Sequence, residues 1–452
     1  MQHTPEYHTL IKLIIDNHPL EQLQHQIDSL IPAEISDLLE AIPYKKRLHI
    51  WEKLDYPIKG EVLTELHEDV QKQIIHETDN ADLVEAVRQL QPDEIADLRQ
   101  SLPEGVEQLI ISKMDHETRQ QYKVVKGYAD NTAGGLMDLD AISVRSETTI
   151  DATLRYFRRL RAQRERFPEH MDAIFIVDRE NHYLGKVSLK DLVSKVPETL
   201  MADIMNTQLI PIKDKESELK VAQKFENEDL ISAPVVNESN QLIGRITIDD
   251  IVDVIRQQGE RLAMSPAGLS ETTDVFSPIL RTVRHRSFWL GINLIIAFFA
   301  AWVIGFYTDI IEQKVALAVL MPVVASMGGV VGNQTLTLVT RGIALDQITS
   351  SNKYHLLFKE IRVGLLNGII WASVVGFIVY AWHHDIHLSL AFSIAMLLSV
   401  VLTATAGTLI PLILNKLNID PAVAGSVLMV AVSDVAGFFI FLSTASIIML
   451  SW

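Results

Sequence analysis

The chain has 452 residues, no cysteine and a formal net charge of −17. Residues 277–452 carry 9 basic and 7 acidic side chains, which leaves 31 basic and 50 acidic ones for residues 1–276. The lack of cysteine excludes disulfides, thiolate zinc sites and cysteine nucleophiles, and the acidic first part argues against nucleic-acid binding, which needs a basic face. The sequence therefore predicts an acidic soluble part followed by an apolar part with almost no net charge.

Residues 1–127 are predicted to form an all-α superhelix of short helices. A segment from Pro32 to Pro43 (PAEISDLLEAIP) recurs from Pro92 to Pro103 (PDEIADLRQSLP). Each copy begins with proline, has carboxylates in its first turn and places apolar residues at helical spacing, which are the signals of a helix start. Repeated helices of this kind stack and share one hydrophobic core. This part is typical of a scaffold and has no catalytic group.

Residues 128–255 change to short apolar strands that lead into helices. The unit occurs twice, with Gly185 and Gly244 at matching places, and it predicts two α/β domains over residues 128–198 and 199–255. A hydroxyl and a carboxylate recur where the last strand of each unit meets its helix; these residues are Ser188, Asp191, Thr247 and Asp250. Such a pair can hold a ribose, and it can equally cap a helix, so both interpretations stay open.

Residues 256–280 are predicted to connect these domains to the apolar part. The amphipathic pattern runs from about Ile251 to Val275, and three carboxylates, those of Asp249, Asp250 and Asp253, cluster at its start. Clustered carboxylates repel one another, and a divalent cation would draw them together. We therefore expect a helix at the membrane surface with an acidic start.

Five apolar stretches make up most of residues 281–452, and each is long enough to cross about 30 Å of hydrocarbon as a helix. They lie near residues 288–307, 315–339, 363–382, 388–414 and 421–449. A soluble core would not repeat such lengths five times with charges confined to the gaps. Basic residues gather before the first stretch, between the second and third and between the fourth and fifth, at Arg281, Arg284, Arg286, Arg341, Lys353, Lys359, Arg362 and Lys416, whereas the other gaps hold only Lys314. Their distribution predicts that the soluble part is cytoplasmic and that the C-terminus lies outside.

One carboxylate falls inside the fifth apolar stretch. Asp434 follows Asp420 by 14 residues, which is about 21 Å of helix and close to the middle of a bilayer. A carboxylate in hydrocarbon costs at least about 2.5–3.5 kcal/mol on insertion scales, and such residues usually mark an ion path. The alternative is a protonated or backbone-bonded side chain that only packs. Asp420 lies directly before Pro421, at the cytoplasmic end of the fifth stretch. Helix capping explains this residue as well as a place on an ion path does.

The second stretch contains a segment rich in glycine and amides. Its candidate ion-path residues are Gly328, Gly329, Asn333 and Gln334. Amides can bind the water shell of an ion, although close helix packing would explain the glycines just as well. In the third stretch, small residues recur every four positions, at Gly364, Gly368, Ala372 and Gly376. We expect this stripe to pack against a neighbouring helix.

The order of these parts resembles the MgtE family of magnesium transporters, which have a helical superhelix, a CBS-domain pair, a connecting helix and five spans. The motifs that carry the resemblance are Tyr128 to Met137 (ending TAGGLM), the GGxxGNQ of the second span with Arg341 after it, and Asp420-Pro421 followed by Asp434-Val435-x-Gly437. The resemblance implies that Asp434 contacts the hydrated cation and that two copies face each other across the pore of a homodimer.

The resemblance also implies a cytoplasmic magnesium sensor at the acidic faces of the superhelix, the CBS pair and the connecting helix. The matching positions are Asp93, Asp97, Asp229, Asp249, Asp250 and Asp253. Val330 stands where the family usually has asparagine, and the segment before Asp434 also differs. These departures keep open an alternative in which the ion is Co²⁺ or another divalent metal.

The sequence thus predicts a multi-domain membrane protein with a superhelical N-domain, an α/β CBS-domain pair, a connecting helix and a five-helix transmembrane domain. We interpret it as a homodimeric, multi-pass inner-membrane channel or transporter that takes up Mg²⁺ and is gated by cytoplasmic Mg²⁺, with ATP as a candidate ligand of the CBS pair. Its partners are then the cation, the membrane lipid and a second copy, without nucleic acid. A membrane-tethered CBS sensor without conduction is the alternative from another class. No motif predicts an enzyme.

Overall fold

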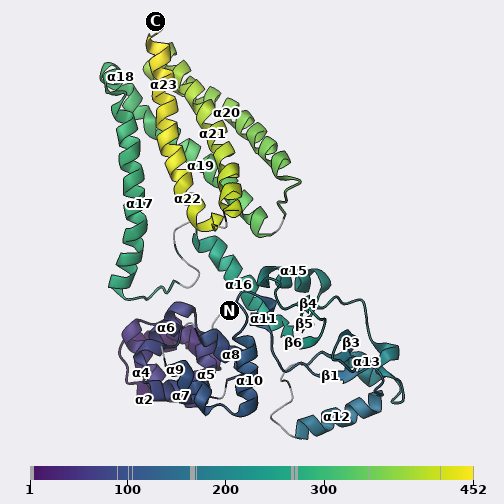
Figure 1. The fold of residues 1–452 in the computed structure, drawn as a ribbon. Coiled ribbons are helices and arrows are strands. Elements are labelled where there is room, and N and C mark those ends of the chain that lie inside the picture. Colours follow the sequence, from purple (N-terminus) through teal and green to yellow (C-terminus); the bar gives the residue numbers. More distant parts are fainter. Residues whose placement is uncertain are drawn as a thin grey trace. The chain divides into compact units, whose positions relative to one another are not determined.

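The computed structural model describes residues 5–88, 90–99, 101–103, 105–162, 168, 171–265, 269, 273–345, 347–417 and 419–450. The chain forms two compact units, one of Met1–Gln258 with Thr272–Ser277 and one of Gly259–Glu271 with Pro278–Trp452. Figure 1 shows the elements coloured along the sequence, with purple helices at the N-terminus and the long helices in green and yellow.

Short helices that share one core form the first part of unit one. They are α1 (Pro5–Ile15), α2 (Leu20–Ile27), α3 (Pro32–Glu40), α4 (Tyr44–Lys53), α5 (Tyr56–Glu65), α6 (Glu68–Glu77), α7 (Asn80–Val87), α8 (Pro92–Leu98), α9 (Val106–Lys113) and α10 (His116–Val125). Their buried apolar side chains make one continuous cluster from Tyr7 to Val125. The all-α fold predicted for this part is confirmed.

The sequence repeat starts a helix in the same way in both copies. Proline occupies the first turn of α3 and of α8. The Glu34 carboxylate accepts a hydrogen bond from the Ile31 backbone N–H at 3.2 Å, and Glu94 accepts one from Gln91 N–H at 2.6 Å. Each carboxylate thereby satisfies a donor that the helix itself leaves unpaired.

Two three-stranded sheets of matching topology follow. The first contains β1 (Ser143–Arg145), β2 (Ala173–Val177) and β3 (Tyr183–Ser188), and the second contains β4 (Ile212–Lys213), β5 (Ser232–Val236) and β6 (Leu242–Thr247). In both, the first pair is parallel and the second antiparallel. The accompanying helices are α11 (Ala133–Leu136), α12 (Ile150–Ala162), α13 (Leu189–Ser194), α14 (Met201–Ile204) and α15 (Glu218–Glu228).

The glycines that revealed this repeat have equivalent places in the two sheets. Gly185 pairs with Ile176 and Gly244 pairs with Val235. A Cβ at Gly185 would lie 2.7 Å from the Asn206 carbonyl oxygen, and one at Gly244 would lie 2.6 Å from the carbonyl oxygen of Asp138. Glycine is needed at both positions because another backbone segment approaches that closely.

The connecting helix is shorter than predicted and begins earlier. Helix α16 (Ile248–Met264) starts directly after β6, and residues 273–277 form a turn. Pro266 lacks a backbone N–H and cannot continue a helix, which accounts for an end near Met264. The prediction of a connecting helix over residues 256–280 is therefore corrected to Ile248–Met264.

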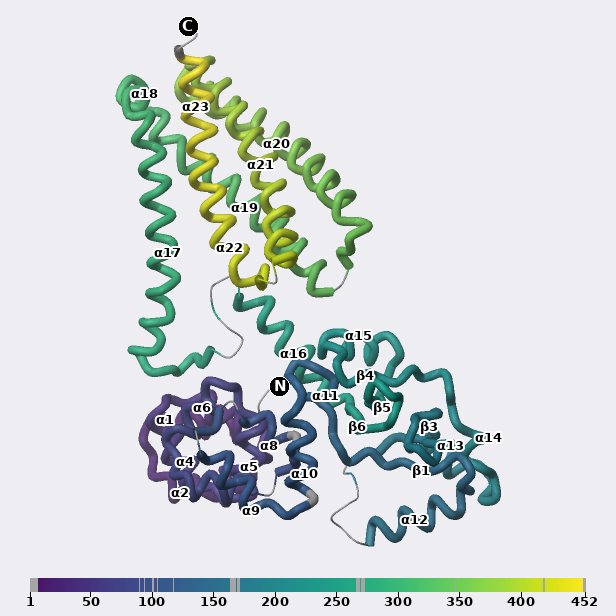
Figure 2. The backbone as a smooth tube through the Cα atoms, viewed as in Figure 1, coloured from purple at the N-terminus to yellow at the C-terminus, as the bar shows by residue number. Residues whose placement is uncertain are grey.

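The second unit contains helices of membrane-spanning length. They are α17 (Ile279–Gly305), α19 (Ala316–Ala344), α20 (Lys353–His383), α21 (Ile386–Lys416) and the series α22 (Pro421–Ala431), η2 (Val432–Ala436) and α23 (Gly437–Leu450); the short helix α18 (Thr308–Gln313) follows α17. By length and apolar composition, the described residues include five helices that could cross a membrane. Figure 2 shows α20 and α21 running side by side.

The small-residue stripe of the third span packs against α21, as predicted. A Cβ at Gly364 would lie 2.9 Å from Ala404 Cβ, and one at Gly368 would lie 2.7 Å from Leu397 Cδ1. Small residues allow the two helices to approach closely, and this contact forms much of the membrane unit's framework.

Candidate functional site

Asp434 lies in the middle of a local break in the fifth span. The span is α-helical over α22 and α23, but the five residues Val432–Ala436 between them form a π-helical turn. A π-turn inserts one residue into the helix, disturbs its hydrogen-bond ladder and is frequently found at functional sites. The sequence predicted the carboxylate and the helix, but not this break.

The Asp434 side chain is half-buried and has a single polar neighbour of note. Ser433 Oγ lies 3.0 Å from the Val430 carbonyl oxygen and 3.4 Å from Asp434 Oδ1. The Ser433 hydroxyl donates its proton in the shorter contact, to the Val430 carbonyl. The hydroxyl therefore replaces little of the hydration that the Asp434 carboxylate loses on burial. Among the described residues, no lysine, arginine or histidine forms an ion pair with Asp434. An ionised carboxylate within a membrane span is costly unless a positive charge or water meets it, and a protonated carboxyl group avoids this cost.

The glycine pair of the second span lies beside the π-turn. A Cβ at Gly329 would lie 3.6 Å from Ser433 Oγ, next to Asp434. Gly328 faces the other way, because its Cβ would lie 2.9 Å from Ser399 Oγ of α21. Gly329 therefore lies next to the Asp434 segment, whereas Gly328 contacts α21, and the role of both glycines in an ion path stays a prediction.

A cavity of about 390 Å³ lies within the membrane unit and reaches the turn before Asp434. Val430, whose carbonyl binds Ser433, is part of its wall. Its polar wall residues come from α17, α19 and α22, and they are Asn293, Asn333, Thr337, Thr340, Arg341 and Ser426. Asn333 thus lines the cavity, most of whose wall is apolar, whereas Gln334 is exposed elsewhere on α19 and does not line the cavity. Asn293, Thr337 and Ser426 were not predicted from the sequence.

Asp420 has two structural partners at the start of α22. Its Oδ1 accepts the Ala422 backbone N–H at 2.8 Å, and its Oδ2 accepts a bond from Arg261 Nη2 at 2.6 Å. The first contact is a helix cap, and the second joins the end of α16 to the fifth span. Sequence reasoning anticipated the cap but missed Arg261, because nothing local connects two residues so far apart in the chain.

The predicted sensor carboxylates occupy several different settings. The Asp93 side chain lies outside the described residues; Asp97, Asp229, Asp249 and Asp253 are exposed, and Asp250 is half-buried. Asp253 pairs with Arg256 at 3.2 Å, and Asp250 accepts the Thr247 hydroxyl at 3.1 Å. Within the described part of the chain, no three histidines or carboxylates are grouped as a ready metal site. The role of these residues in sensing stays a prediction.

A further carboxylate, that of Glu65, belongs to the same acidic region. Burial raises the pKa of Glu65, the charge of Asp253 raises this pKa further, and Arg256 lowers it. Glu65 ends α5 of the N-domain, while Asp253 and Arg256 lie on α16, so the fold brings an acid of the N-domain to the start of the connecting helix. No local pattern in the sequence predicts this contact.

The hydroxyl–carboxylate pairs of the two sheets act as helix caps. Ser188 Oγ accepts the Asp191 backbone N–H at 3.1 Å and donates to its carboxylate at 2.7 Å. The Asp250 carboxylate accepts from the Thr247 N–H at 3.2 Å as well as from its hydroxyl. The capping interpretation therefore describes both places, and the ribose interpretation stays a prediction.

Comparisons with known proteins assign each part of the chain. Residues 321–444 match the MgtE family model, described as a divalent cation transporter, residues 30–131 match the MgtE intracellular N domain, and residues 133–198 and 201–257 match CBS domains. The chain belongs to the MgtE family. It is a multi-pass membrane protein with intracellular N-terminal domains, and the predicted family and fold class are confirmed.

Its relatives include two full-length transporters. The magnesium transporter MgtE of Bacillus subtilis is 24% identical over 441 residues, which cover 96% of each chain. The magnesium transporter MgtE of Thermus thermophilus is 28% identical over 375 residues, covering 82% of this chain and 79% of the relative. Among solved structures, the cytosolic domain of the Mg²⁺ channel MgtE in complex with ATP matches 54% of this chain and 99% of that one at 26% identity, with a TM-score of 0.48.

Proposed function

We propose that this protein is a homodimeric channel or transporter for Mg²⁺ uptake that is gated by cytoplasmic Mg²⁺. The observation that carries the proposal is the setting of Asp434, a carboxylate that has no basic partner among the described residues and lies on a π-turn, beside Gly329 and close to a cavity that polar side chains help to line. The relatives named as magnesium transporters support the choice of ion.

The chemistry of Mg²⁺ suits such a site. The ion gives up water reluctantly and usually binds through one or two carboxylates while it keeps several waters. One Asp434 from each subunit, across a two-fold axis, would supply two carboxylates, and amides such as Asn333 would meet the water shell. A dication would also remove the repulsion between the two acids. With the C-terminus outside, an inside-negative potential favours uptake by about 2.3 kcal/mol per charge per 100 mV.

Gating follows from the acidic contact between the N-domain and α16. Burial is the largest cause of the raised pKa of Glu65, and the charge of Asp253 raises this pKa further, so the two carboxylates repel each other when both are ionised. A divalent cation that binds between the acidic faces favours the compact state, and this difference in affinity is what a ligand needs to shift a conformational equilibrium. Internal Mg²⁺ would thereby close the pathway once its concentration is sufficient.

Flux into liposomes tests the pathway. Asp434→Asn keeps the size of the side chain and removes its charge, and we expect it to abolish Mg²⁺ flux while the protein stays dimeric by light scattering. Glu360→Gln is the matched control, because Glu360 is a buried acid of another span that is already paired with Lys359 at 3.0 Å. Unchanged flux in Asp434→Asn would refute the proposal and favour a sensor without conduction. Flux of Co²⁺ but not Mg²⁺ would favour the other ion.

ATP is a proposed ligand of the CBS pair. Ser188, Asp191, Thr247 and Asp250 are the residues proposed to meet its ribose, and they would do so from their positions as caps. Calorimetric titration of the full chain with ATP tests this, with Asp191→Asn and Asp250→Asn compared with the wild type. Equal affinity in all three proteins would assign these residues to capping alone.

A further inference from the structure

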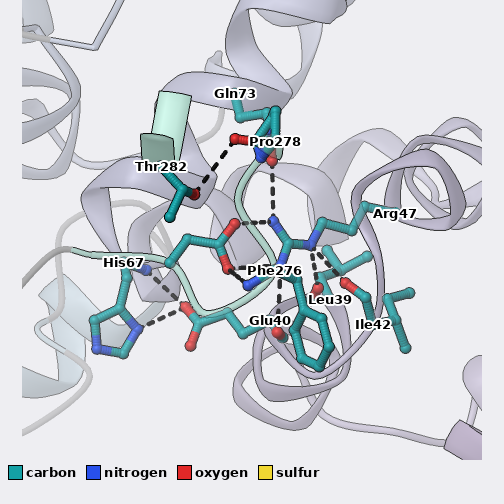
Figure 3. Close-up of polar contacts among 10 residues, drawn as sticks. Leu39, Glu40, Ile42, Arg47, His67, Gln73, Phe276, Pro278 and Thr282 are labelled. Atoms are coloured by element: carbon teal, nitrogen blue, oxygen red, sulfur yellow. Dashed lines mark hydrogen bonds and ion pairs between the residues drawn. The ribbon is translucent and has the colours of Figure 1, made fainter. Parts of the chain in front are cut away.

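A buried arginine of the N-domain binds the linker that precedes the first span. Arg47 of α4 is fully buried, and the Asp274 side chain is 3% exposed. Arg47 Nη1 lies 2.6 Å from Asp274 Oδ2, and Nη2 lies 2.9 Å from Oδ1. Figure 3 shows the dashed lines that meet at Arg47, close to Phe276 of the linker. Paired bonds of this kind are the strong form of an arginine–carboxylate contact.

The end of α3 prepares the site for the guanidinium group. Arg47 Nε donates to the carbonyls of Leu39 at 2.6 Å and Ile42 at 3.0 Å, and Nη2 lies 3.3 Å from the Glu40 carbonyl. Nη1 also donates to Gln73 Oε1 at 2.9 Å (Figure 3). The last carbonyls of a helix lack partners within it and carry partial negative charge. Arg47 is therefore held in place by the N-domain, and Asp274 supplies the full negative charge that it lacks.

The linker is organised around the same carboxylate. Phe276 N–H donates to Asp274 Oδ1 at 2.8 Å, and Ser277 N–H contacts the Asp274 carbonyl at 3.3 Å. Close to the pair, the Glu40 carboxylate accepts from His67 N–H at 2.8 Å and contacts its Nδ1 at 2.7 Å, which fixes the residue whose carbonyl faces Arg47. Hydrogen bonds to Asp274 thus order the turn of residues 273–277.

The path of the chain makes this contact a connection between the units. The end of α16 and all of α17 belong to the membrane unit, whereas Thr272–Ser277 belong with the N-domain. Asp274 precedes Ile279, the first residue of α17, by five residues. Five residues reach at most about 18 Å when fully extended. A displacement of the N-domain that keeps the pair intact acts on the start of the first span once these five residues are extended.

We propose that the Arg47–Asp274 pair couples the position of the N-domain to the first span and so sets the Mg²⁺ concentration at which the pathway closes. This rests on the proposed gating. Both charges of the pair belong to the protein, so the N-domain holds the linker without any bound metal. If the linker detaches, Arg47 stays buried without its negatively charged partner, which is costly. We therefore expect the linker to be either fully bound to the N-domain or fully released. Mg²⁺ then has only to bring the acidic faces together.

Hydrogen exchange of the full-length protein in nanodiscs tests the pair without reference to transport. Asp274→Asn is the variant of choice, because it leaves Arg47 and its bonds to α3 in place. We expect the amides of Phe276 and Ser277 to exchange at least tenfold faster in this variant, with the α3–α6 peptides unchanged. The matched control is Asp151→Asn, which removes an exposed pair with Arg155 at 2.9 Å. Unchanged exchange in the linker would overturn the proposal.

Flux measured against internal Mg²⁺ tests the coupling. In Asp274→Asn we expect at least tenfold more Mg²⁺ to be needed for closure, with flux at low Mg²⁺ as in the wild type. Faster linker exchange together with an unchanged closing concentration would show a static attachment and would reject the coupling. If the wild type does not close with Mg²⁺ at all, the proposed gating fails and the coupling fails with it, whereas the exchange result still decides whether the pair holds the linker.

Discussion

Replacing Gly407 by alanine should destabilise the membrane domain, because the new methyl group meets backbone. On α21, a Cβ at Gly407 would lie 2.6 Å from the Gly332 carbonyl oxygen of α19 and 2.9 Å from Thr335 Cβ. A carbonyl oxygen inside a helix cannot rotate away, so the two helices must separate. Overpacking of this kind costs about 1–3 kcal/mol. For a unit of this size, each kcal/mol lowers the melting temperature by about 2–4 °C.

Two further glycines turn this into a controlled comparison. At Gly332, a Cβ would lie 2.4 Å from Met429 Cε, the far end of a flexible side chain that can move, so Gly332→Ala should cost less. At Gly291 of α17, no heavy atom lies within 4 Å of the added Cβ, so Gly291→Ala should be neutral. The assay is thermal unfolding in detergent, followed by size-exclusion of the remaining folded protein. If Gly407→Ala melts together with Gly291→Ala, the packing argument is wrong.

Three further predictions concern single side chains. The Tyr183 hydroxyl is buried without a hydrogen-bond partner among the described residues, so Tyr183→Phe should stabilise the CBS pair by about 1–3 kcal/mol; a lower melting temperature would contradict this. Glu65→Gln removes the repulsion with Asp253 and should lower the Mg²⁺ concentration that closes the pathway in flux assays. Because the pKa of Glu65 is raised in the folded protein, the compact state is favoured below the unfolded pKa of about 4.3 and loses this advantage as the pH rises through the folded value. Mild acid should therefore also lower the closing concentration of Mg²⁺. An unchanged closing concentration in Glu65→Gln would show that Glu65 is not part of the sensor. Lys314 is bonded to Asp385 at 2.5 Å and lowers its pKa, aided by the backbone N–H groups of α21. This stabilisation is present above the unfolded pKa of about 3.9 and is lost as the pH falls through the lowered folded value. Melting curves between pH 7 and pH 3 should therefore show a smaller loss of stability in Lys314→Met than in the wild type, and parallel curves would exclude the contact.

The elements that the sequence predicted well are those encoded by local patterns. The proline-led repeat, the two Gly-centred α/β units and the five apolar stretches all depend on residues within one helix or hairpin. The spans even begin and end close to the predicted places, apart from α17 and α20, which extend as amphipathic helices before their apolar parts. The one clear error concerns the end of the connecting helix, which lies at Met264. The amphipathic pattern continues beyond Pro266, and the prediction gave this pattern more weight than the helix-breaking effect of the proline.

The missed features all depend on residues that are far apart in the chain. Arg47 and Asp274 are separated by 227 positions, and Arg261 and Asp420 by 159. No periodicity links such residues, so only the folded chain shows that they meet. The π-turn at Asp434 was missed for a different reason. No pattern in Val432–Ala436 distinguishes a π-turn from an α-helical turn, so only the folded chain shows the insertion.

The arginine–aspartate pairs also explain how metal sensing and mechanical connection can coexist in one acidic region. Asp253 is 59% exposed and its partner Arg256 is 50% exposed. An exposed pair of this kind contributes about 0–1 kcal/mol, so a dication that binds Asp253 can displace the guanidinium at little cost. The Arg47–Asp274 pair is buried, and removing one partner of such a pair costs about 3–5 kcal/mol. Under the proposed gating, Mg²⁺ would compete at the exposed carboxylates, where occupancy can follow its concentration, and the buried pair would transmit the result to the first span.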